Sequence, residues 1–349
     1  MSRYKVTLTP LDWFFFGGEQ TFDNGITQSF IARSMRFPQQ TTLLGMVRYQ
    51  LLKQNNLLLT GNEEKDKSIV SDMETLIGKD SFDIETKDTQ SFGKIKSISP
   101  AFIQIGGHQL VPMPLTNGIN ISFDTGEVWL SGIKKEKIIK ASSYNEKGYD
   151  NYCKMIDETG KAWDIEGDDG IFTSSMQIGI TKADRVDENE KGFYKQEVLR
   201  FKSGDASFAF YLELEENTKL DCGFVFMGAQ RSCFKMEVKE SDETLFVPDH
   251  PVGSILLLSP TYISSRAILD ANCLQHWSGT ISFRNLQQKV GGKLKSGAIH
   301  YHRHSSLCTF LTAGTVIFFQ DANQLIKLKE ILNNNHLKNI GYNNYSVKE

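Results

Sequence analysis

The sequence predicts an α+β fold in which one strand-and-helix unit occurs twice. In the first half, residues 4–11 alternate between apolar and polar side chains, and residues 41–54 carry apolar side chains at helical spacing. In the second half, residues 224–228 and 315–319 form apolar strand patterns, and a helix pattern follows at residues 325–332. Two such layers in one chain favour a pair of ferredoxin-like (RRM-like) units, although no clean repeat period accompanies them.

We divide the chain into two domains of ordinary size, residues 1–214 and residues 215–349. Residues 62–93 are polar and charged, and we interpret them as an insertion into the first domain. Turn residues and charges dominate residues 117–170, where we predict a single short strand at residues 127–133.

The composition is that of a globular protein, with 40% hydrophobic and 23% charged residues among 349. No apolar run reaches the ~20 residues that a membrane span needs. The chain starts directly with a strand pattern instead of a secretory apolar segment, so we expect a cytoplasmic protein. Its five cysteines form no Cys-x-x-Cys pair, which signals neither a zinc ribbon nor a disulfide framework. We therefore predict no metal and no cofactor.

The net charge of −3 lacks the basic excess of a free-standing nucleic-acid binder. Basic residues do cluster locally, and acidic residues gather elsewhere, including residues 164–169. The basic clusters comprise Arg33, Arg36 and Arg48, then Lys182 and Arg185, and then Lys293, Lys295 and Arg303. Such segregation would suit a subunit that contacts RNA on one face and proteins on others.

The most informative segment joins a strand to a helix through a glycine break. An aromatic strand tail ends at Gly17-Gly18, and the loop that follows carries Arg33 and Arg36 ahead of Pro38. Proline fixes a backbone angle that suits a first helical turn, so Pro38 marks the start of the helix. Free amide groups and the positive dipole end at such a start favour phosphate, which predicts an anion site here.

Side chains of this helix complete the predicted site. Thr41 and Thr42 can offer their hydroxyls to unpaired amides of the first turn, and Arg48 adds a cation further along. We expect the helix to pack closely at Gly45, so that a bulky residue there would damage folding.

A long hairpin with a charged tip is predicted around residues 172–214. Its tip, residues 182–191, has nothing apolar to bury, so we expect it to project from the body with Lys182 and Arg185 exposed. Arg231 follows a glycine turn between two strong strands and could contact a ligand or lie on the surface of a tight hairpin.

Residues 300–304 contain three of the seven histidines, His300, His302 and His304. In a strand, alternate residues share one face, and a His-x-His pair can chelate zinc. No carboxylate or cysteine of suitable spacing accompanies them. We therefore favour a strand face at an RNA or protein contact, or simple exposure, over a metal site.

An ordered series of short motifs resembles the RAMP proteins of CRISPR systems. The series comprises Phe37-Pro38 before Thr41-Thr42-x-x-Gly45-x-x-Arg48, Ser99-Pro100 to Pro112-x-Pro114, Gln177-Ile178-Gly179-Ile180 to Gly192-Phe193-Tyr194, and Ala313-Gly314-Thr315-Val316 before Ile340-Gly341-Tyr342. No single motif is specific, and their order over nearly the whole chain carries the resemblance. Within the superfamily, the chain is most similar to the third subunit of the type III-B (Cmr) effector complex, a member of the Cas5-like group.

The resemblance implies a non-catalytic RNA-binding subunit that holds the 5′ tag of the guide RNA (crRNA). Such a subunit sits at the foot of the complex, between the large polymerase-like (Cas10-type) subunit and the first backbone RAMP subunit of the Cmr filament. Its fold would be two ferredoxin-like domains with a thumb-like β-hairpin that presses on the guide where tag meets spacer.

By the same resemblance, the thumb corresponds to residues 178–194, with Lys182 and Arg185 as its basic residues. The other implied RNA-binding positions are Arg33, Arg36, Thr41, Thr42, Arg48, Arg231, Lys338 and Tyr342. Aromatic faces under splayed bases help to hold single-stranded RNA, which makes Phe37, Tyr194 and Tyr342 stacking candidates. The terminal loop departs from the family pattern, because it has Gly341 alone where many members have several glycines.

Two other interpretations stay open. One is a metal-independent endoribonuclease of the same superfamily, which would process repeat RNA with His300, His302 or His304 as acid–base groups. Such enzymes usually place a histidine near the first helix, and residues 22–52 contain none. The other is a subunit of a neighbouring type III subtype with the same architecture.

Overall fold

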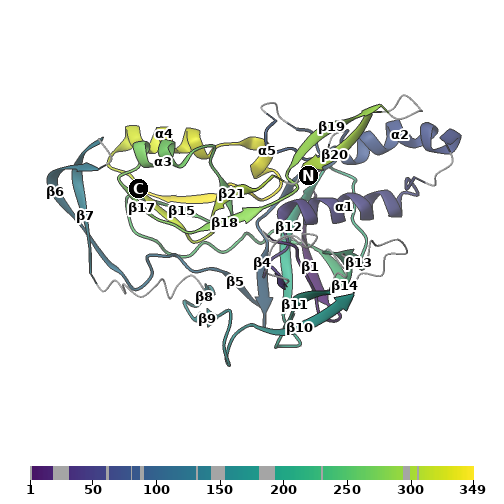
Figure 1. The fold of residues 1–349 in the computed structure, drawn as a ribbon, viewed down its shortest axis with the longest axis horizontal. Helices are drawn as coiled ribbons and strands as arrows, with labels where there is room; N and C mark the ends of the chain where they lie inside the picture. The colour runs from purple at the N-terminus through teal and green to yellow at the C-terminus, as the bar shows by residue number, and fades with distance from the viewer. Residues whose placement is uncertain are drawn as a thin grey trace.

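The computed structural model describes residues 2–18, 31–59, 63–79, 81–86, 90–130, 133–142, 154–180, 193–228, 231–293, 299–304 and 306–349. Within these ranges, only the backbone is described for residues 63–67, 125–130, 133–138, 142, 179–180, 193–194, 288–293, 299–304 and 335. Figure 1 shows two lobes, one that carries α1 and α2 and one that carries α3 and α4. In the described part of the chain, no helix is long and apolar enough to cross a membrane.

A nine-stranded sheet forms the N-terminal lobe. Its strands follow the order β13-β14-β1-β12-β4-β5-β8-β9, and β3 also pairs with β12. Their bounds are β1 (Ser2–Pro10), β3 (Ile95–Ile98), β4 (Phe102–Ile105), β5 (His108–Pro112), β8 (Lys154–Ile156), β9 (Ala162–Asp164), β12 (Ser207–Leu214), β13 (Gly223–Met227) and β14 (Ser232–Glu240). The alternation of β1 places Tyr4, Val6 and Leu8 in the core, as the sequence predicts.

Helix α1 (Gln40–Gln54) covers the inner face of this sheet, and α2 (Glu63–Ile77) lies within the predicted insertion. The apolar stripe of α1, which includes Leu43, Val47 and Leu51, is fully buried in the main core. Gly45 lies on the opposite, exposed side, where a Cβ atom would meet nothing within 4 Å. The close packing predicted at Gly45 is therefore wrong, because the stripe faces away from it.

The C-terminal lobe has the chain order β-α-β-β-α-β. Its elements are β15 (Ser254–Leu257), α3 (Arg266–Asn272), β17 (Gln275–Trp277), β22 (Val316–Phe318), α4 (Ala322–Leu332) and β23 (Tyr345–Lys348). The sheet order is β17-β22-β15-β23 with every neighbour antiparallel, so its strands lie in space as second, third, first and fourth. In the N-terminal sheet, β4, β12, β1 and β14 repeat this order, also antiparallel.

Both lobes carry additional strands. A small sheet has the order β16-β21-β18, made of β16 (Thr261–Tyr262), β18 (Thr280–Phe283) and β21 (Cys308–Leu311). Two hairpins pair β6 (Asn120–Leu130) with β7 (Ile133–Ser142) and β19 (Gln287–Lys293) with β20 (Ile299–His304). The short helix α5 (Asn335–Lys338) follows α4.

The β6–β7 hairpin corrects the prediction of mostly turns with one short strand at residues 127–133. Ile121 on β6 and Ile139 on β7 pack against the core cluster that contains Leu115 and Trp277. This contact with the distant C-terminal lobe stabilises two long strands that local charge and turn residues did not reveal.

Strands β10 (Phe172–Ile180) and β11 (Phe193–Phe201) pair as a hairpin, which is shorter than the predicted range of residues 172–214 because β12 belongs to the nine-stranded sheet. Strand β2 (Ile31–Arg33) pairs in parallel with β11. The tip, with Lys182 and Arg185, lies outside the described residues, so its projection stays a prediction.

One hydrophobic core connects the two lobes. Tyr342, Phe310 and Phe283 of the C-terminal half belong to the same cluster as Val6 and Leu43 of the N-terminal half. The predicted division at residue 214 falls between β12 and β13, although β13 and β14 continue the first sheet. The second sheet begins at β15, so the structure places the change of lobe within residues 241–253.

Candidate nucleic-acid interface

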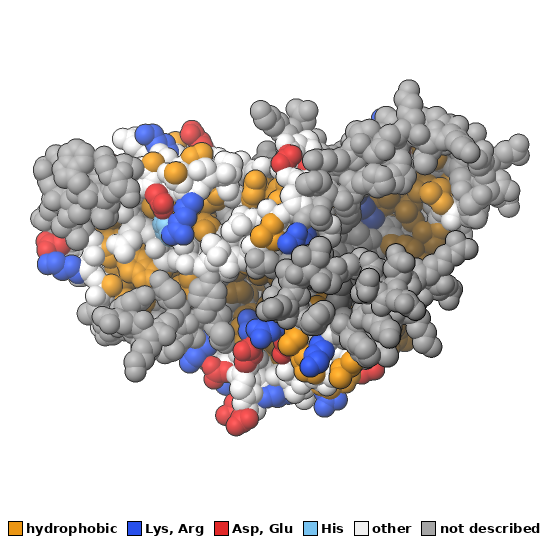
Figure 2. Space-filling model, viewed as in Figure 1, with side chains coloured by type: hydrophobic (Ala, Val, Ile, Leu, Met, Phe, Trp, Pro, Cys, Tyr) orange, Lys and Arg blue, Asp and Glu red, His pale blue; other side chains and the backbone are white. Residues whose placement is uncertain are grey.

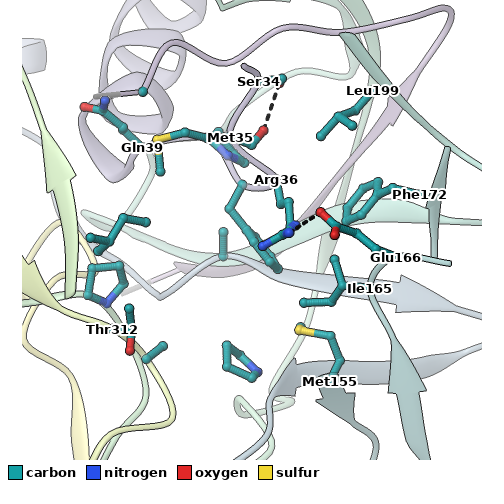
Figure 3. Close-up of a pocket in the computed structure, with 18 of the residues that line it drawn as sticks. Ser34, Met35, Arg36, Gln39, Met155, Ile165, Glu166, Phe172, Leu199 and Thr312 are labelled. Carbon is teal, nitrogen blue, oxygen red and sulfur yellow. Dashed lines mark hydrogen bonds and ion pairs between the residues drawn. The ribbon is translucent and has the colours of Figure 1, made fainter. Parts of the chain in front are cut away.

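A cleft of about 1050 Å³ opens between the two lobes (Figure 3). One wall is the basic loop, which we define as residues 33–39, leading from β2 into α1. The loop of residues 165–168 and strands β10 and β11 contribute a second wall. Residues 258–260 and 312–313 of the C-terminal lobe close the third side.

Apolar side chains line part of the cleft beside its charged groups. In Figure 3, Phe172, Leu199, Ile165 and Met155 gather on the side that faces Arg36. Phe37, which is half-buried, meets the core ring of Phe208 at a centroid distance of 5.9 Å. Phe37 thus keeps part of its ring at the cleft, and its predicted stacking role stays open.

Both predicted arginines of the basic loop line the cleft, and both face carboxylates. Arg36 forms an ion pair with Glu166, and Figure 3 shows the two side chains pointing toward each other. Arg33 Nε lies 3.7 Å from a carboxylate oxygen of Glu197 on β11, yet the Arg33 side chain remains 76% exposed. These are surface ion pairs, each worth about 0–1 kcal/mol, so a phosphate can compete for either guanidinium.

Two lysines that the sequence analysis did not single out also line the cleft. Lys154 Nζ lies 3.7 Å from Asp164, and Lys202 Nζ donates to the carbonyl oxygens of Gly167 at 2.5 Å and Asp168 at 2.8 Å. The acidic residues 164–169 therefore lie against the basic groups, which corrects the predicted separation of the two charge types. Figure 2 likewise shows acidic and basic side chains intermingled over the region of β8 to β11.

Backbone pairing fixes the basic loop to the base of the long hairpin. In the parallel pair of β2 and β11, Arg33 is in register with Glu197, and the Ser34 amide donates to the Glu197 carbonyl at 3.1 Å. The Ser34 hydroxyl also accepts from the Phe16 amide at 3.0 Å. Arg33 is thus held on the same small sheet as the predicted thumb.

The N-terminus of α1 lies at the cleft but is arranged differently from the prediction. Gln39 is the N-cap residue, and its side chain makes no capping hydrogen bond. The Gln40 side-chain amide donates to the carbonyl oxygens of Ser99 at 3.2 Å and Gly341 at 3.1 Å, which ties the helix start to both lobes. Thr41 is buried and Thr42 half-buried, neither is the N-cap residue, and capping by their hydroxyls stays a prediction.

Tyr342 lines the inner end of the cleft, but its ring is fully buried. The ring packs against Phe310 and Phe283 at centroid distances of 5.1 and 6.0 Å. Burial raises the pKa of its phenol far above the usual range, an effect that Thr41 and Gln40 partly oppose. A buried ring offers no face to a base, so the structure corrects the stacking role predicted for Tyr342.

Like Thr41 and Thr42, three further predicted residues lie outside the cleft lining. Arg48 places its guanidinium over the Phe92 ring, 5.4 Å from the centroid. Lys338 lies over Tyr345 and donates to Asn333 at 2.6 Å, and burial lowers its pKa. Arg231 is exposed at the turn between β13 and β14. Their contribution to RNA binding stays a prediction.

The remaining predicted residues cannot be placed as side chains. Lys182 and Arg185 lie outside the described residues, and Tyr194 is described only as backbone. The predicted histidine strand is confirmed as β20, with His300 and His302 paired to β19, but the imidazoles themselves are not described. Within the side chains that are described, no cluster suited to a metal ion occurs.

Sequence reasoning found the basic loop and missed its counterpart. Glu166, Lys154 and Lys202 reach the cleft through the folding of β8, β9 and the hairpin base, far from the basic loop in sequence. The only signal in the sequence was the acidic run at residues 164–169, which we had assigned to a separate surface.

A family model matches residues 6–347, described as CRISPR-associated protein (Cas_Cmr3). The chain belongs to the Cmr3 family of CRISPR-associated proteins. This confirms the family that the order of the short motifs predicted. A search of curated proteins finds no match.

Solved structures of type III complexes contain similar chains. One, from the cryo-EM structure of type III-B Cmr-beta bound to cognate target RNA and AMPPnP, is 16% identical with a TM-score of 0.49, and the match covers 98% of this chain and 95% of that chain. Another, from the Csm3-Csm4 subcomplex of the type III-A interference complex, is 12% identical with a TM-score of 0.36, covering 91% and 93%. Both sequence identities and both TM-scores are low. The family assignment therefore rests on the family model alone.

Proposed function

We propose that this Cmr3-family chain is a non-catalytic subunit of a type III-B CRISPR effector complex, and that it binds and positions the 5′ tag of the crRNA in the cleft. The observation that carries the proposal is the placement of Arg33 and Arg36 on one wall of this cleft, with Arg33 tied by β-pairing to the long hairpin. Cations at phosphates and an aromatic face under a base are the groups that hold single-stranded RNA.

The size of the cleft favours a strand over a small ligand. Ordinary ligand pockets measure about 300–1,000 Å³, and this cleft lies at the upper limit of that range and opens to solvent. Its cations come from separate elements, with Arg33 and Arg36 on the basic loop, Lys154 on β8 and Lys202 after β11. A few nucleotides of an extended strand suit that distribution.

The rest of the proposal concerns architecture. Both lobes are ferredoxin-like units, a proposal supported by the shared antiparallel strand order and by the β-α-β-β-α-β chain order of the C-terminal lobe. The β10–β11 hairpin is the thumb, and its tip meets the guide where tag joins spacer. The protein partners are the large polymerase-like (Cas10-type) subunit and the adjacent backbone RAMP subunit.

The experiment compares the binding subunit with the rival endoribonuclease. Purified protein is incubated with end-labelled RNA that carries the repeat-derived tag and with RNA of the same length and shuffled tag sequence. We expect retention of the tagged RNA, intact, with weaker retention of the shuffled RNA. Cleavage products that disappear in His302→Ala would instead establish the nuclease, and equal binding of both RNAs would remove the tag from the proposal.

A further inference from the structure

The outer edge of the nine-stranded sheet is formed by β13, which pairs only with β14 among the described strands. Its side chains alternate strictly between the two faces of the sheet. Val225 and Met227 are buried, whereas Phe224 and Phe226 are 58% and 56% exposed. Two large aromatic rings therefore stand side by side on the open face of an edge strand.

Natural edge strands usually carry features that prevent another strand from pairing with them, such as lysine, proline or a bulge. The sequence of β13, Gly-Phe-Val-Phe-Met, has none of these, and its register with β14 runs without a shift. An exposed apolar surface beside unpaired backbone groups is characteristic of an interaction site. This edge is therefore prepared to accept a further strand.

Cations flank the two rings. The Arg231 guanidinium lies over the Phe226 ring, 5.6 Å from its centroid, and Lys235 is in register with Phe224 on the neighbouring strand. Lys235 is paired with Glu237 at 2.6 Å, whereas no carboxylate among the described side chains forms an ion pair with Arg231. An acidic group on a partner would complement Arg231.

The two described ends of the turn, Gly228 and Arg231, are joined by a backbone hydrogen bond. Arg231 has a φ of +54° and Gly228 a φ of +80°, and the Arg231 amide donates to the Gly228 carbonyl at 3.1 Å. A Cβ atom at Gly228 would collide with the Phe15 carbonyl oxygen, so only glycine fits there. Arg231 thus lies next to the C-terminal end of β13, at the start of β14.

We propose that the edge patch, defined as Phe224, Phe226, Arg231 and Lys235, docks an extended segment of a neighbouring protein subunit. That segment adds a strand to β13, places apolar side chains against the two rings, and presents a carboxylate to Arg231. A protein fits better than RNA because a strand satisfies the free backbone groups of the edge, and because Glu237 offsets Lys235. The inference rests on the proposed function for one thing only, which is that the partner comes from the effector complex. It assigns Arg231 to a contact with protein instead of RNA.

The test uses the assembled complex, expressed with all its subunits, and the isolated chain. Hydrogen exchange of residues 223–227 is measured in both states, and native mass spectrometry counts the subunits that co-purify. We expect exchange of β13 to slow by at least about tenfold on assembly. Phe224→Ser with Phe226→Ser should lose one protein subunit, while the variant chain alone stays as stable as the parent.

Ile326→Ser is the matched control, since Ile326 is 55% exposed on α4, in the other lobe. It should assemble like the parent. Equal exchange of β13 in the free and assembled chain, or normal assembly of the double variant, would overturn the proposal. Protection of β13 by guide RNA alone would also overturn it, because the patch would then be an RNA site.

Binding of tagged RNA by the double variant keeps this proposal separate from the proposed function. RNA binding through the cleft should survive the loss of both rings. If the parent itself does not bind the tag, the proposed function fails. Hydrogen exchange of β13 in the free and assembled chain still shows whether the edge patch docks a protein.

Discussion

At the scale of single residues, the cleft combines its cations with acceptors that RNA would have to replace under the proposed function. Arg36 contacts Glu166, and Lys202 is held by carbonyl oxygens of the same loop. The loop is tight, because the Gly170 amide donates to the Gly167 carbonyl at 3.1 Å and a Cβ at Gly170 would collide with the Glu166 backbone. Glu166 thus occupies the position at Arg36 that a phosphate would take.

Removal of this competing carboxylate should strengthen RNA binding. Glu166→Gln keeps the size of the side chain but removes its charge, and a surface ion pair is worth up to about 1 kcal/mol. We expect the Kd for tagged RNA to fall by up to about fivefold, measured by fluorescence anisotropy. Glu216→Gln, at an exposed acid outside the cleft lining, should leave the Kd unchanged. An unchanged or weaker affinity of Glu166→Gln would show that Glu166 does not compete.

Two glycines should respond in opposite directions to the same substitution. Gly45→Ala places a methyl group in open space on an exposed helix face and should stabilise the protein by about 0.5–1 kcal/mol. Gly341 has a φ of +93°, and a Cβ there would lie 2.7 Å from the Ser99 carbonyl oxygen, so Gly341→Ala should cost more than about 1 kcal/mol. Urea unfolding of both variants measures the change in the free energy of unfolding and its sign. A loss of stability in Gly45→Ala would contradict this account and support the close packing at Gly45 that the sequence suggested.

At the scale of elements, the turn between β8 and β9 is organised by one buried carboxylate. Asp157, which is 1% exposed, accepts from the Thr159 amide and hydroxyl at 2.9 and 2.6 Å and from the Trp163 ring at 2.7 Å. The hairpin that it fixes presents Lys154 and Met155 to the cleft. Burial acts to raise the pKa of Asp157, but these hydrogen bonds outweigh it and lower the pKa to about 2.

A lowered pKa means that the folded state favours the ionised form of Asp157. Its contribution to the free energy of unfolding, about 2 kcal/mol, is therefore complete above pH ~4 and disappears as the pH falls toward 2. Asp157→Asn should lower stability at pH 7, and the difference from the parent should shrink between pH 4 and pH 2. Denaturant titrations at pH 7, 4 and 3 measure the difference in the free energy of unfolding between the parent and the variant. A difference that does not depend on pH would contradict the role of the charge.

Local patterns predicted the elements that local sequence stabilises. Helix α1 was expected at residues 41–54 and runs from Gln40 to Gln54, and the strands at residues 4–11 and 315–319 are present as β1 and β22. The β6–β7 hairpin was missed because its apolar residues are buried by the distant C-terminal lobe. The start of α1 depends on a similar long-range contact, since Gln40 bonds to Ser99 in its own lobe and to Gly341 in the other.

At the scale of the whole molecule, the two lobes share one core and should unfold together. Tyr342 lies within that core, with its ring between Phe310, Phe283 and Phe82. Tyr342→Ala should cost about 3–5 kcal/mol, as large-to-small changes of buried aromatic residues do. Tyr342→Phe keeps the ring and should cost less than about 1.5 kcal/mol. Calorimetry should show one transition for the parent, and two separate transitions would contradict a shared core.

The site as a whole shows what a sequence can and cannot reveal. The basic loop was predictable, because Arg33, Arg36 and Pro38 lie together beside a helix start. The opposing wall was not, because Glu166 and Lys202 reach it through the folding of β8, β9 and the hairpin base, far from the basic loop in sequence. The burial of aromatic residues was the least predictable property. Phe37 and Tyr342 were both stacking candidates, but Phe37 is half-buried and Tyr342 is fully buried.

The central claim is that Arg33 and Arg36 hold RNA phosphates in the cleft, and the salt dependence of binding tests it most directly. Anisotropy titrations of tagged RNA at several salt concentrations compare the parent, Arg33→Ala with Arg36→Ala, and Arg266→Ala. Arg266 lies in the other lobe and is a matched control. Its side chain is 66% exposed, and its Nε lies 3.9 Å from a carboxylate oxygen of Asp270. The account predicts that the double variant weakens binding about tenfold or more and that its log–log salt slope falls by about 1.4, since each contact to a single strand contributes about 0.7. Titrations of the double variant that coincide with those of the parent and of Arg266→Ala would contradict it.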